Sequence, residues 1–180
     1  SVVEWLTALF LLLSAYLSLV TGLSKGSPYT KWLLLAFASI FFVAFMEELA
    51  WGQMMFGWET PENFRSLNAQ GETTLHNING IHDLVSPALL LFSSAAACIS
   101  LTKQRPNIPL LRSKLLRFSK GLFPVFFLAI IICSVVVFMP YTQFLGRVNQ
   151  DIEWAEFLIS FSIFMHSLSL IANPIKESNN

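Results

Sequence analysis

Hydrophobic residues along the chain gather into five long runs, each close to the ~20 residues that a helix needs to cross a bilayer. The runs cover about residues 2–23, 32–51, 84–102, 121–139 and 152–172. Few charged residues interrupt them, and the alternation of polar and apolar positions typical of a strand is missing. The pattern predicts a single transmembrane domain over residues 1–180, an all-α integral membrane protein built as a bundle of five transmembrane helices.

The polar loop between the second and third runs, residues 52–83, carries helix signals of its own. Thr60 is a suitable N-cap, and the proline and acid that follow favour a first helical turn. We therefore expect a structured outer loop with a short surface helix over residues 61–67. Ser86 and Pro87 form a second cap pair, which predicts that the third span begins late, near Ser86.

Basic residues are concentrated in the loop between the third and fourth runs, residues 103–120, which contains no acid. Loops rich in Lys and Arg stay on the cytoplasmic side. We therefore expect the N-terminus outside and the C-terminus inside, in a bacterial cytoplasmic (inner) membrane. The aromatic residues that then fall at the outer interface are Trp5, Trp51, Trp58, Tyr141 and Trp154.

Composition narrows the class of protein further. Only 12% of the residues are charged, about half the share of a soluble domain, so the expected partner is the lipid bilayer. The net charge of zero gives no basic field for nucleic acid. Cys98 and Cys133 both fall inside apolar runs and predict small buried side chains rather than a disulfide. Because Ser1 is not an initiator methionine, we expect that residues precede it.

Two adjacent acids near the end of the second run need a physical reason. Glu47 and Glu48 lie ~22 Å along a helix that begins at Trp32, where a charge is costly. Ala44 and Gly52 flank Glu48 one turn away on either side, and small residues at that spacing indicate a close helix contact. We therefore expect Glu48 to face the bundle. The alternative is that both carboxylates reach outer water at the helix end.

The fifth run supplies a second group of acids. Glu153 and Glu156 share one helical face, and Asp151 is a suitable cap before them. The helix dipole favours acids in a first turn, which explains Glu153 better than Glu156. His166, ~18 Å below Trp154 by helical rise, is a functional candidate because it lies within a span. A hydrogen bond to a serine of a neighbouring helix is the alternative role for His166.

The outer loop adds side chains of the kinds that bind metals. Histidines and carboxylates together suit Zn, Mn or Fe, although the chain has no HExxH and no paired ExxH motif. A divalent metal is thus one expected cofactor. Its candidate ligands are Glu47, Glu72, His82 and Asp83.

Three stretches form a compound motif: "EELAWGQ", "GWETPE" and "NAQGETTLHN", between Glu47 and Asn77. The motif resembles the signature of an uncharacterised bacterial family of polytopic membrane proteins. This resemblance implies a membrane fold and brings no activity with it. The chemistry is also similar to that of ceramidase-like membrane hydrolases, which use His, Asp and Ser with zinc. Their paired histidines on a late helix are absent, since the fifth run has His166 alone.

The first interpretation is a membrane enzyme with an outward-facing carboxylate and histidine pocket. It would be a metal-dependent hydrolase or transferase that acts on a lipid or lipid-linked substrate. The predicted catalytic residues are Glu48, His76 and Glu156. The predicted substrate-binding residues are Trp51, Gln53, Asn68, Gln70 and Asn77.

The second interpretation is a non-catalytic subunit or scaffold of a larger membrane complex, with other subunits or further copies of the chain as partners. The polar loop is then a structural cap, and Glu47 and Glu48 pair with Arg65, Arg147 or a partner's basic residue. The two interpretations differ in where they place the acids and histidines. An enzyme predicts that the acids and histidines meet around one cavity, whereas a scaffold predicts dispersed acids that each have a local hydrogen-bond donor.

Overall fold

The computed structural model describes residues 1–24, 27–68, 71–102, 114–116, 118–138 and 148–172. The long helices are α1 (Val2–Ser24), α2 (Pro28–Glu48), α5 (His82–Leu101), α7 (Phe123–Phe138) and α8 (Val148–Ala172). All five are long and apolar enough to cross a membrane, when the short turn η3 (Lys120–Leu122) is counted with α7. The described residues contain no strand. The prediction of an all-α membrane protein is therefore confirmed.

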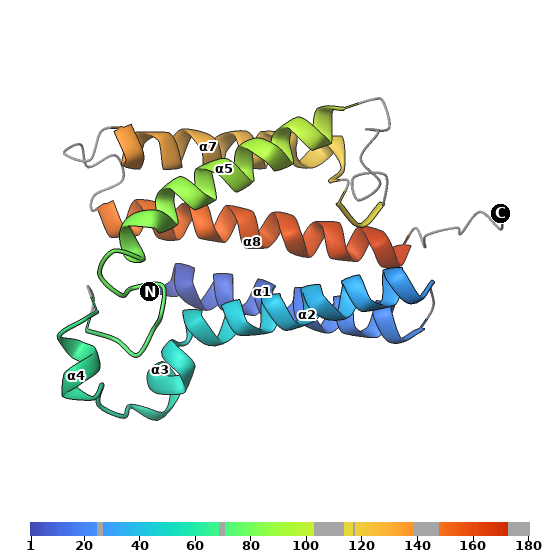
Figure 1. Ribbon diagram of the computed structural model, residues 1–180. Coiled ribbons are helices and arrows are strands. Elements are labelled where there is room, and N and C mark those ends of the chain that lie inside the picture. The colour runs from blue at the N-terminus through green and yellow to red at the C-terminus, as the bar shows by residue number, and fades with distance from the viewer. Residues whose placement is uncertain (25–26, 69–70, 103–113, 117, 139–147, 173–180) are drawn as a thin grey trace.

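Helix α8 joins two helix pairs into one bundle. Packing contacts link α1 to α2 and to α8, and they link α7 to α8 and to α5. Figure 1 shows the α1–α2 pair on one side of α8 and the α5–α7 pair on the other, with α5 crossing α7 obliquely. Because α1 and α8 begin at the same end of the bundle as the end of α2, acids from these three helices lie at similar depth.

Small side chains allow α1 to lie close to its neighbours. The small residues buried on α1 are Thr7, Ala8, Ser14, Ala15, Ser18 and Gly22. A Cβ atom added at Gly22 would lie only 3.1 Å from the Cβ atom of Leu34 on α2. Small residues of this kind are typical of helix contacts in membranes, where van der Waals packing is the main attraction. On the α8 side, the Phe10 ring packs against three phenylalanine rings, with centroids 5.2 to 5.8 Å apart.

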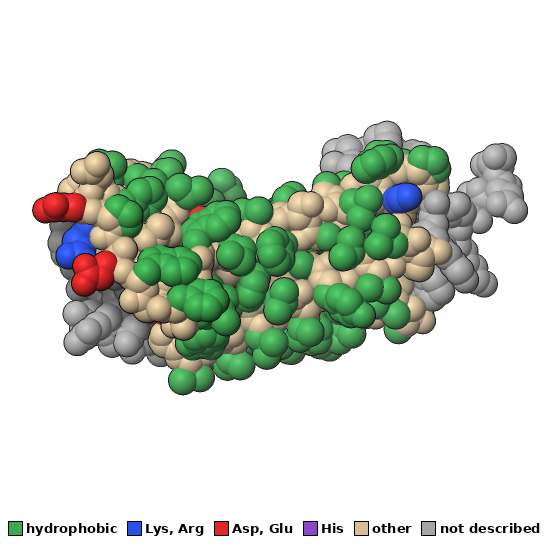
Figure 2. All heavy atoms as spheres, turned by 90° about the horizontal axis from the view of Figure 1, so that it is seen from below, with side chains coloured by type: hydrophobic (Ala, Val, Ile, Leu, Met, Phe, Trp, Pro, Cys, Tyr) green, Lys and Arg blue, Asp and Glu red, His purple; other side chains and the backbone are tan. Residues whose placement is uncertain are grey.

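Helix α2 lies at the edge of the bundle and exposes most of its surface. Leu34 and Ala38 are its buried residues. Seen from below in Figure 2, this face of the molecule is largely hydrophobic, and charged side chains appear only towards its ends. An apolar band with charged ends is the surface that a lipid bilayer requires.

Helix boundaries around the polar loop differ from those predicted. Helix α5 begins at His82 rather than near Ser86, because turns in the preceding loop already direct the chain into a helix. The backbone N–H groups of His82 and Leu84 donate to the carbonyl oxygens of Ile78 and Ile81, each at 2.9 Å. Pro87 is therefore inside the helix instead of at its start.

The second span ends at Glu48, three residues earlier than predicted, because the backbone turns sharply there. Ala50, Trp51 and Gly52 all have left-handed backbone angles, with φ of 47°, 56° and 95°. Such angles are strained for residues with a Cβ atom and are held only where the surroundings fix them. Ala50 is completely buried, which anchors this turn.

Replacing Gly52 by alanine should destabilise the protein more than replacing Gly57. Both glycines have left-handed φ, so either substitution should cost about 1 kcal/mol of backbone strain. A Cβ atom at Gly52 would lie 3.0 Å from the Trp58 ring, whereas nothing lies within 4 Å of one at Gly57. The exposed Trp58 ring must shift to admit this Cβ atom, which should add about 0.5–1.5 kcal/mol at Gly52. Thermal unfolding of both variants in one detergent measures the difference, and equal losses would contradict the crowding at Gly52.

Candidate functional site

The chain between α2 and α5, residues 49–81, forms a structure that we call the cap loop. It contains the turn η1 (Ala50–Gly52) and two short helices, α3 (Gln53–Phe56) and α4 (Glu62–Arg65). The predicted surface helix over residues 61–67 is therefore only one turn long, at α4. The cap loop lies against the end of the bundle where α1 and α8 begin (Figure 1). We call this end the cap end.

Glu47, in the last turn of α2, fastens the cap loop to the bundle. One carboxylate oxygen of Glu47 accepts a hydrogen bond from the Trp51 indole N–H. The other accepts from the backbone N–H groups of Leu75 at 2.7 Å and His76 at 3.1 Å. It also lies 3.2 Å from Nδ1 of the His76 ring. Since a carboxylate only accepts, the His76 Nδ1 atom is the donor, and in a neutral ring Nε2 then carries the lone pair.

Hydrogen bonds within the cap loop hold its own shape. The Gln53 side chain donates to Thr60 Oγ1 at 2.8 Å and accepts from the Thr73 backbone N–H at 2.9 Å. Asn68 is buried; its side-chain amide donates to the Thr74 carbonyl oxygen at 2.8 Å, and its oxygen accepts from the backbone N–H of Glu72 at 3.2 Å. These contacts are local, and they make the cap loop a folded unit rather than a passive connection.

A small cavity lies beneath the cap loop, where it meets the ends of the helices. Its lining residues are Glu4, Glu47, Glu48, Met54, Glu72, His76, Asn77, His82, Val85, Ile152, Glu153 and Glu156. The volume is about 40 Å³, enough for a water molecule or a small functional group and too little for a lipid headgroup. Helices α1, α2, α5 and α8 and the cap loop all contribute to the lining, so the cavity depends on the whole fold.

The three residues predicted to be catalytic, Glu48, His76 and Glu156, all line this cavity. Glu48 and Glu156 reach it from two different helices, α2 and α8. Within the described part of the chain, no side-chain hydrogen bond or ion pair reaches either carboxyl. Glu47 differs, because it has four donors. Adjacent acids in the sequence therefore have different environments: Glu47 holds the cap loop, and Glu48 faces the cavity.

The predicted metal ligands are not assembled into one set. Glu47, Glu72 and His82 line the cavity, but Asp83 is exposed and lies outside it. Among the described residues, no group of three or more His, Cys, Asp and Glu side chains is placed to hold a metal ion. Glu47 is occupied by the cap loop and Asp83 is exposed on α5, so a metal at this site stays a prediction.

The residues predicted to bind substrate are divided between the cavity and the cap loop. Asn77 is buried, lines the cavity, and its side-chain oxygen lies 3.3 Å from Nδ1 of His82. Gln53 and Asn68 do not line the cavity and instead hold the cap loop together, as described above. Trp51 does not line it either and is exposed. Gln70 lies outside the described residues.

Two acids in the lining were not among the predicted site residues: Glu4 and Glu153. Glu153 accepts a hydrogen bond from the Ser1 hydroxyl at 2.7 Å. A signal for Glu4 was present in the sequence, because it begins the first apolar run at the same predicted level as Glu48 and Glu156. Comparing the predicted membrane depth of the acidic residues in all five spans would have identified Glu4.

Glu72 brings a further carboxyl from the cap loop to the cavity. Burial raises the pKa of Glu72, and the negative charges of Glu4 and Glu153 act in the same direction. Glu72 therefore holds a proton more readily than an exposed glutamate does.

His166 belongs to a different part of the bundle. Its Nε2 atom lies 2.8 Å from the carbonyl oxygen of Leu115, and its ring packs against Phe118 with centroids 4.7 Å apart. The alternative of a serine partner is not what the structure shows, because a backbone carbonyl takes the hydrogen bond. Its Nδ1 atom is buried without a partner among the described residues. His166 does not line the cavity, so we assign it a packing role near Leu115.

The predicted pairing of Glu47 or Glu48 with arginine does not occur at Arg65, since no such ion pair is found among the described residues. Arg147 lies outside them.

Comparisons with known proteins give no further guide to this site. No protein-family model, curated protein or solved structure matches the chain.

Replacing Glu47 by alanine should loosen the cap loop. The substitution leaves the Leu75 and His76 backbone N–H groups without their acceptor, and each such loss costs about 1–3 kcal/mol. We expect hydrogen exchange of these two amides to accelerate at least tenfold, measured by mass spectrometry in detergent. Glu59→Ala, an exposed acid in the same loop, is the matched control and should leave exchange unchanged. Unchanged exchange in Glu47→Ala would contradict the fastening role.

Proposed function

We propose that the protein is a membrane enzyme that uses general acid–base chemistry on a lipid or lipid-linked substrate, with hydrolysis or group transfer as the reaction. One observation carries this proposal. Glu48 of α2 and Glu156 of α8 line one cavity with His76, and no donor among the described residues satisfies either carboxyl. Convergent carboxyls beside a histidine are the groups that donate and accept protons in such reactions.

The roles of the three residues follow from their contacts. His76 donates through Nδ1 to Glu47, so its Nε2 lone pair is the candidate base. It would take a proton from water or from a substrate hydroxyl as that oxygen attacks. A protonated Glu48 or Glu156 would then give its proton to the leaving group. Glu47 acts through His76 as a positioning residue, because it fixes the ring and its tautomer.

The charge of the lining restricts the substrate. Six glutamates line the cavity, and the lining contains no Lys or Arg. Such a site repels a phosphate or carboxylate and favours a neutral or cationic group. We therefore infer that the reacting end of the substrate is an ester, amide, hydroxyl or amine. Because the cavity holds only a small group, the remainder of the substrate stays outside it, in the bilayer.

Orientation and location are also proposals. The start of α2, which contains Lys31, lies at the end of the bundle opposite the cap end (Figure 1). The short turns η2 (Lys114–Leu116) and η3, which begin with Lys114 and Lys120, lie near the same end. The rule that basic segments remain inside favours a cap end that faces outward, with the N-terminus out, in a bacterial cytoplasmic membrane. The site would then meet substrate in the outer leaflet.

A non-catalytic subunit is the second candidate function. The observation in its favour is that Glu47, Gln53 and Asn68 are each satisfied by local hydrogen bonds, as a structural cap requires. The exposed apolar surface of α2 would then bind another subunit or a second copy of the chain. Glu48 and Glu156 fit this candidate less well, because a cap gives no reason for two unsatisfied acids in one cavity.

Replacing Glu48 or Glu156 by glutamine should abolish turnover with little change in fold. The test incubates the purified protein in nanodiscs of mixed amino-, glyco- and neutral lipids and follows the lipids by mass spectrometry. Loss of an acid–base group lowers rates about 10²–10⁴-fold, and we expect this loss for Glu48→Gln, Glu156→Gln and His76→Gln.

Glu62→Gln, an exposed acid on α4, is the matched control and should keep full activity. Thermal unfolding checks that each variant is folded. Wild-type turnover that survives in both Glu48→Gln and Glu156→Gln would contradict the assignment. No turnover by the wild type, together with stable co-purification of another membrane protein, would favour the subunit.

A further inference from the structure

Four side chains at the start of the cap loop are large, apolar or aromatic, and exposed. They are Trp51, Met55, Phe56 and Trp58, with exposed fractions of 39%, 59%, 74% and 44%. We call this set the apolar edge of the cap loop. The Phe56 and Trp58 rings stack with centroids 5.7 Å apart, so they form one surface. Exposed large apolar residues gathered in this way mark a contact with a partner or a membrane.

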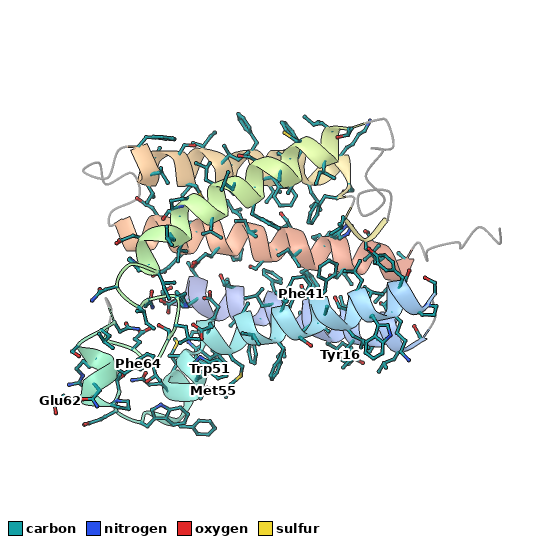
Figure 3. All side chains as sticks on the ribbon, viewed as in Figure 1. Tyr16, Phe41, Trp51, Met55, Glu62 and Phe64 are labelled. Atoms are coloured by element: carbon teal, nitrogen blue, oxygen red, sulfur yellow. The ribbon has the colours of Figure 1, made fainter. Side chains whose placement is uncertain are left out.

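The backbone turn after α2 places this edge beside the bundle. Three successive left-handed residues turn the chain sharply, so that α3 leaves the axis of α2 and lies just below its end in Figure 1, on the side away from α8. Figure 3 shows the Trp51 and Met55 side chains on the side of the bundle away from α8. The turn is strained, and an isolated loop would not adopt it without a reason.

The two faces of α3 have different environments. Met54 lines the cavity, and Gln53 bonds to Thr60 and Thr73 within the cap loop. Met55 and Phe56 are exposed and do not line the cavity. One side of this turn therefore forms a wall of the cavity while the other forms the apolar edge.

The position of the apolar edge along the bundle, relative to the thickness of a bilayer, indicates what it contacts. Helix α2 has 21 residues, a length of ~32 Å that matches the ~30 Å of hydrocarbon in a bilayer. Glu48 at its end therefore lies near the boundary between acyl chains and headgroups. The apolar edge begins three residues later, at Trp51, and therefore lies close to that boundary. The face of the molecule seen in Figure 2 is largely hydrophobic, as contact with acyl chains requires.

We propose that Trp51, Met55, Phe56 and Trp58 insert into the interfacial layer of the bilayer, as a membrane anchor beside α2. Tryptophan favours this layer because its ring is apolar and its N–H is polar. Trp51 already has its N–H bonded to Glu47, so the anchor and the fastening of the cap loop share a residue. The anchor would hold the cavity wall at headgroup level. In this proposal α3 contacts the membrane surface, whereas α4, whose Glu62 and Arg65 are charged, does not.

Spin labels on the whole protein test this proposal. Single cysteines replace Phe56 and, in a second variant, Met55, in a background where Cys98 is serine and Cys133 is alanine. A nitroxide is attached and the protein is placed in phosphatidylcholine nanodiscs. Collisions with oxygen, which concentrates in lipid, and with a water-soluble nickel chelate, are compared for each label. Glu62→Cys on α4 is the matched control.

Labels at positions 55 and 56 should collide at least threefold more with oxygen, relative to nickel, than the label at position 62. Equal ratios at all three positions would overturn the proposal, because the edge would then be in water. Low collision rates with both reagents would also overturn it, since the edge would then be covered by a second copy of the chain. Broadened spectra from neighbouring labels would identify that second case.

Discussion

A carboxylate at the end of a membrane-spanning helix needs hydrogen-bond donors, and the bilayer has few to offer. Glu47 meets this constraint by binding the backbone of the chain that follows it. Two N–H groups from residues 75 and 76, the Trp51 indole and the His76 ring all converge on one carboxylate. The fold of the cap loop depends on this contact, since it joins the last turn of α2 to a segment nearly thirty residues later. The position of His76 in the cavity is a consequence of the same contact.

The next residue has the opposite environment, and the candidate site arises from this difference. Glu48 points into a cavity that α8 closes with Glu153 and Glu156, and α1 with Glu4. Many negative charges around so small a space are costly unless protons or a cationic group compensate them. A helix bundle held together only by the packing of apolar side chains would not need these acidic side chains. The site and the cap are therefore parts of one arrangement, in which Glu47 holds the cap loop in place and Glu48 faces the cavity.

The sequence predicted the spans well because long apolar runs carry a strong and simple signal. It also predicted that Glu48, His76 and Glu156 lie together, since each polar residue in an apolar chain stands out. It could not predict the left-handed turn at Ala50 and Trp51, because neither residue normally adopts such angles. That turn decides that Trp51 faces outward. The roles of Gln53 and Asn68 stayed open between substrate binding and a structural cap, since a polar side chain in a loop gives no sign of whether it will bind its own backbone or a ligand.

The most direct measurement asks whether α2 and α8 share one cavity. Cysteines are placed at positions 48 and 156 in the background without Cys98 and Cys133, and a short bis-methanethiosulfonate reagent is added to the protein in nanodiscs. The account predicts that mass spectrometry will find the two positions linked in most molecules. A matched pair at positions 83 and 156 should stay unlinked, because Asp83 lies outside the cavity. Failure to link positions 48 and 156 in a folded protein, or equal linking of both pairs, would contradict the shared site.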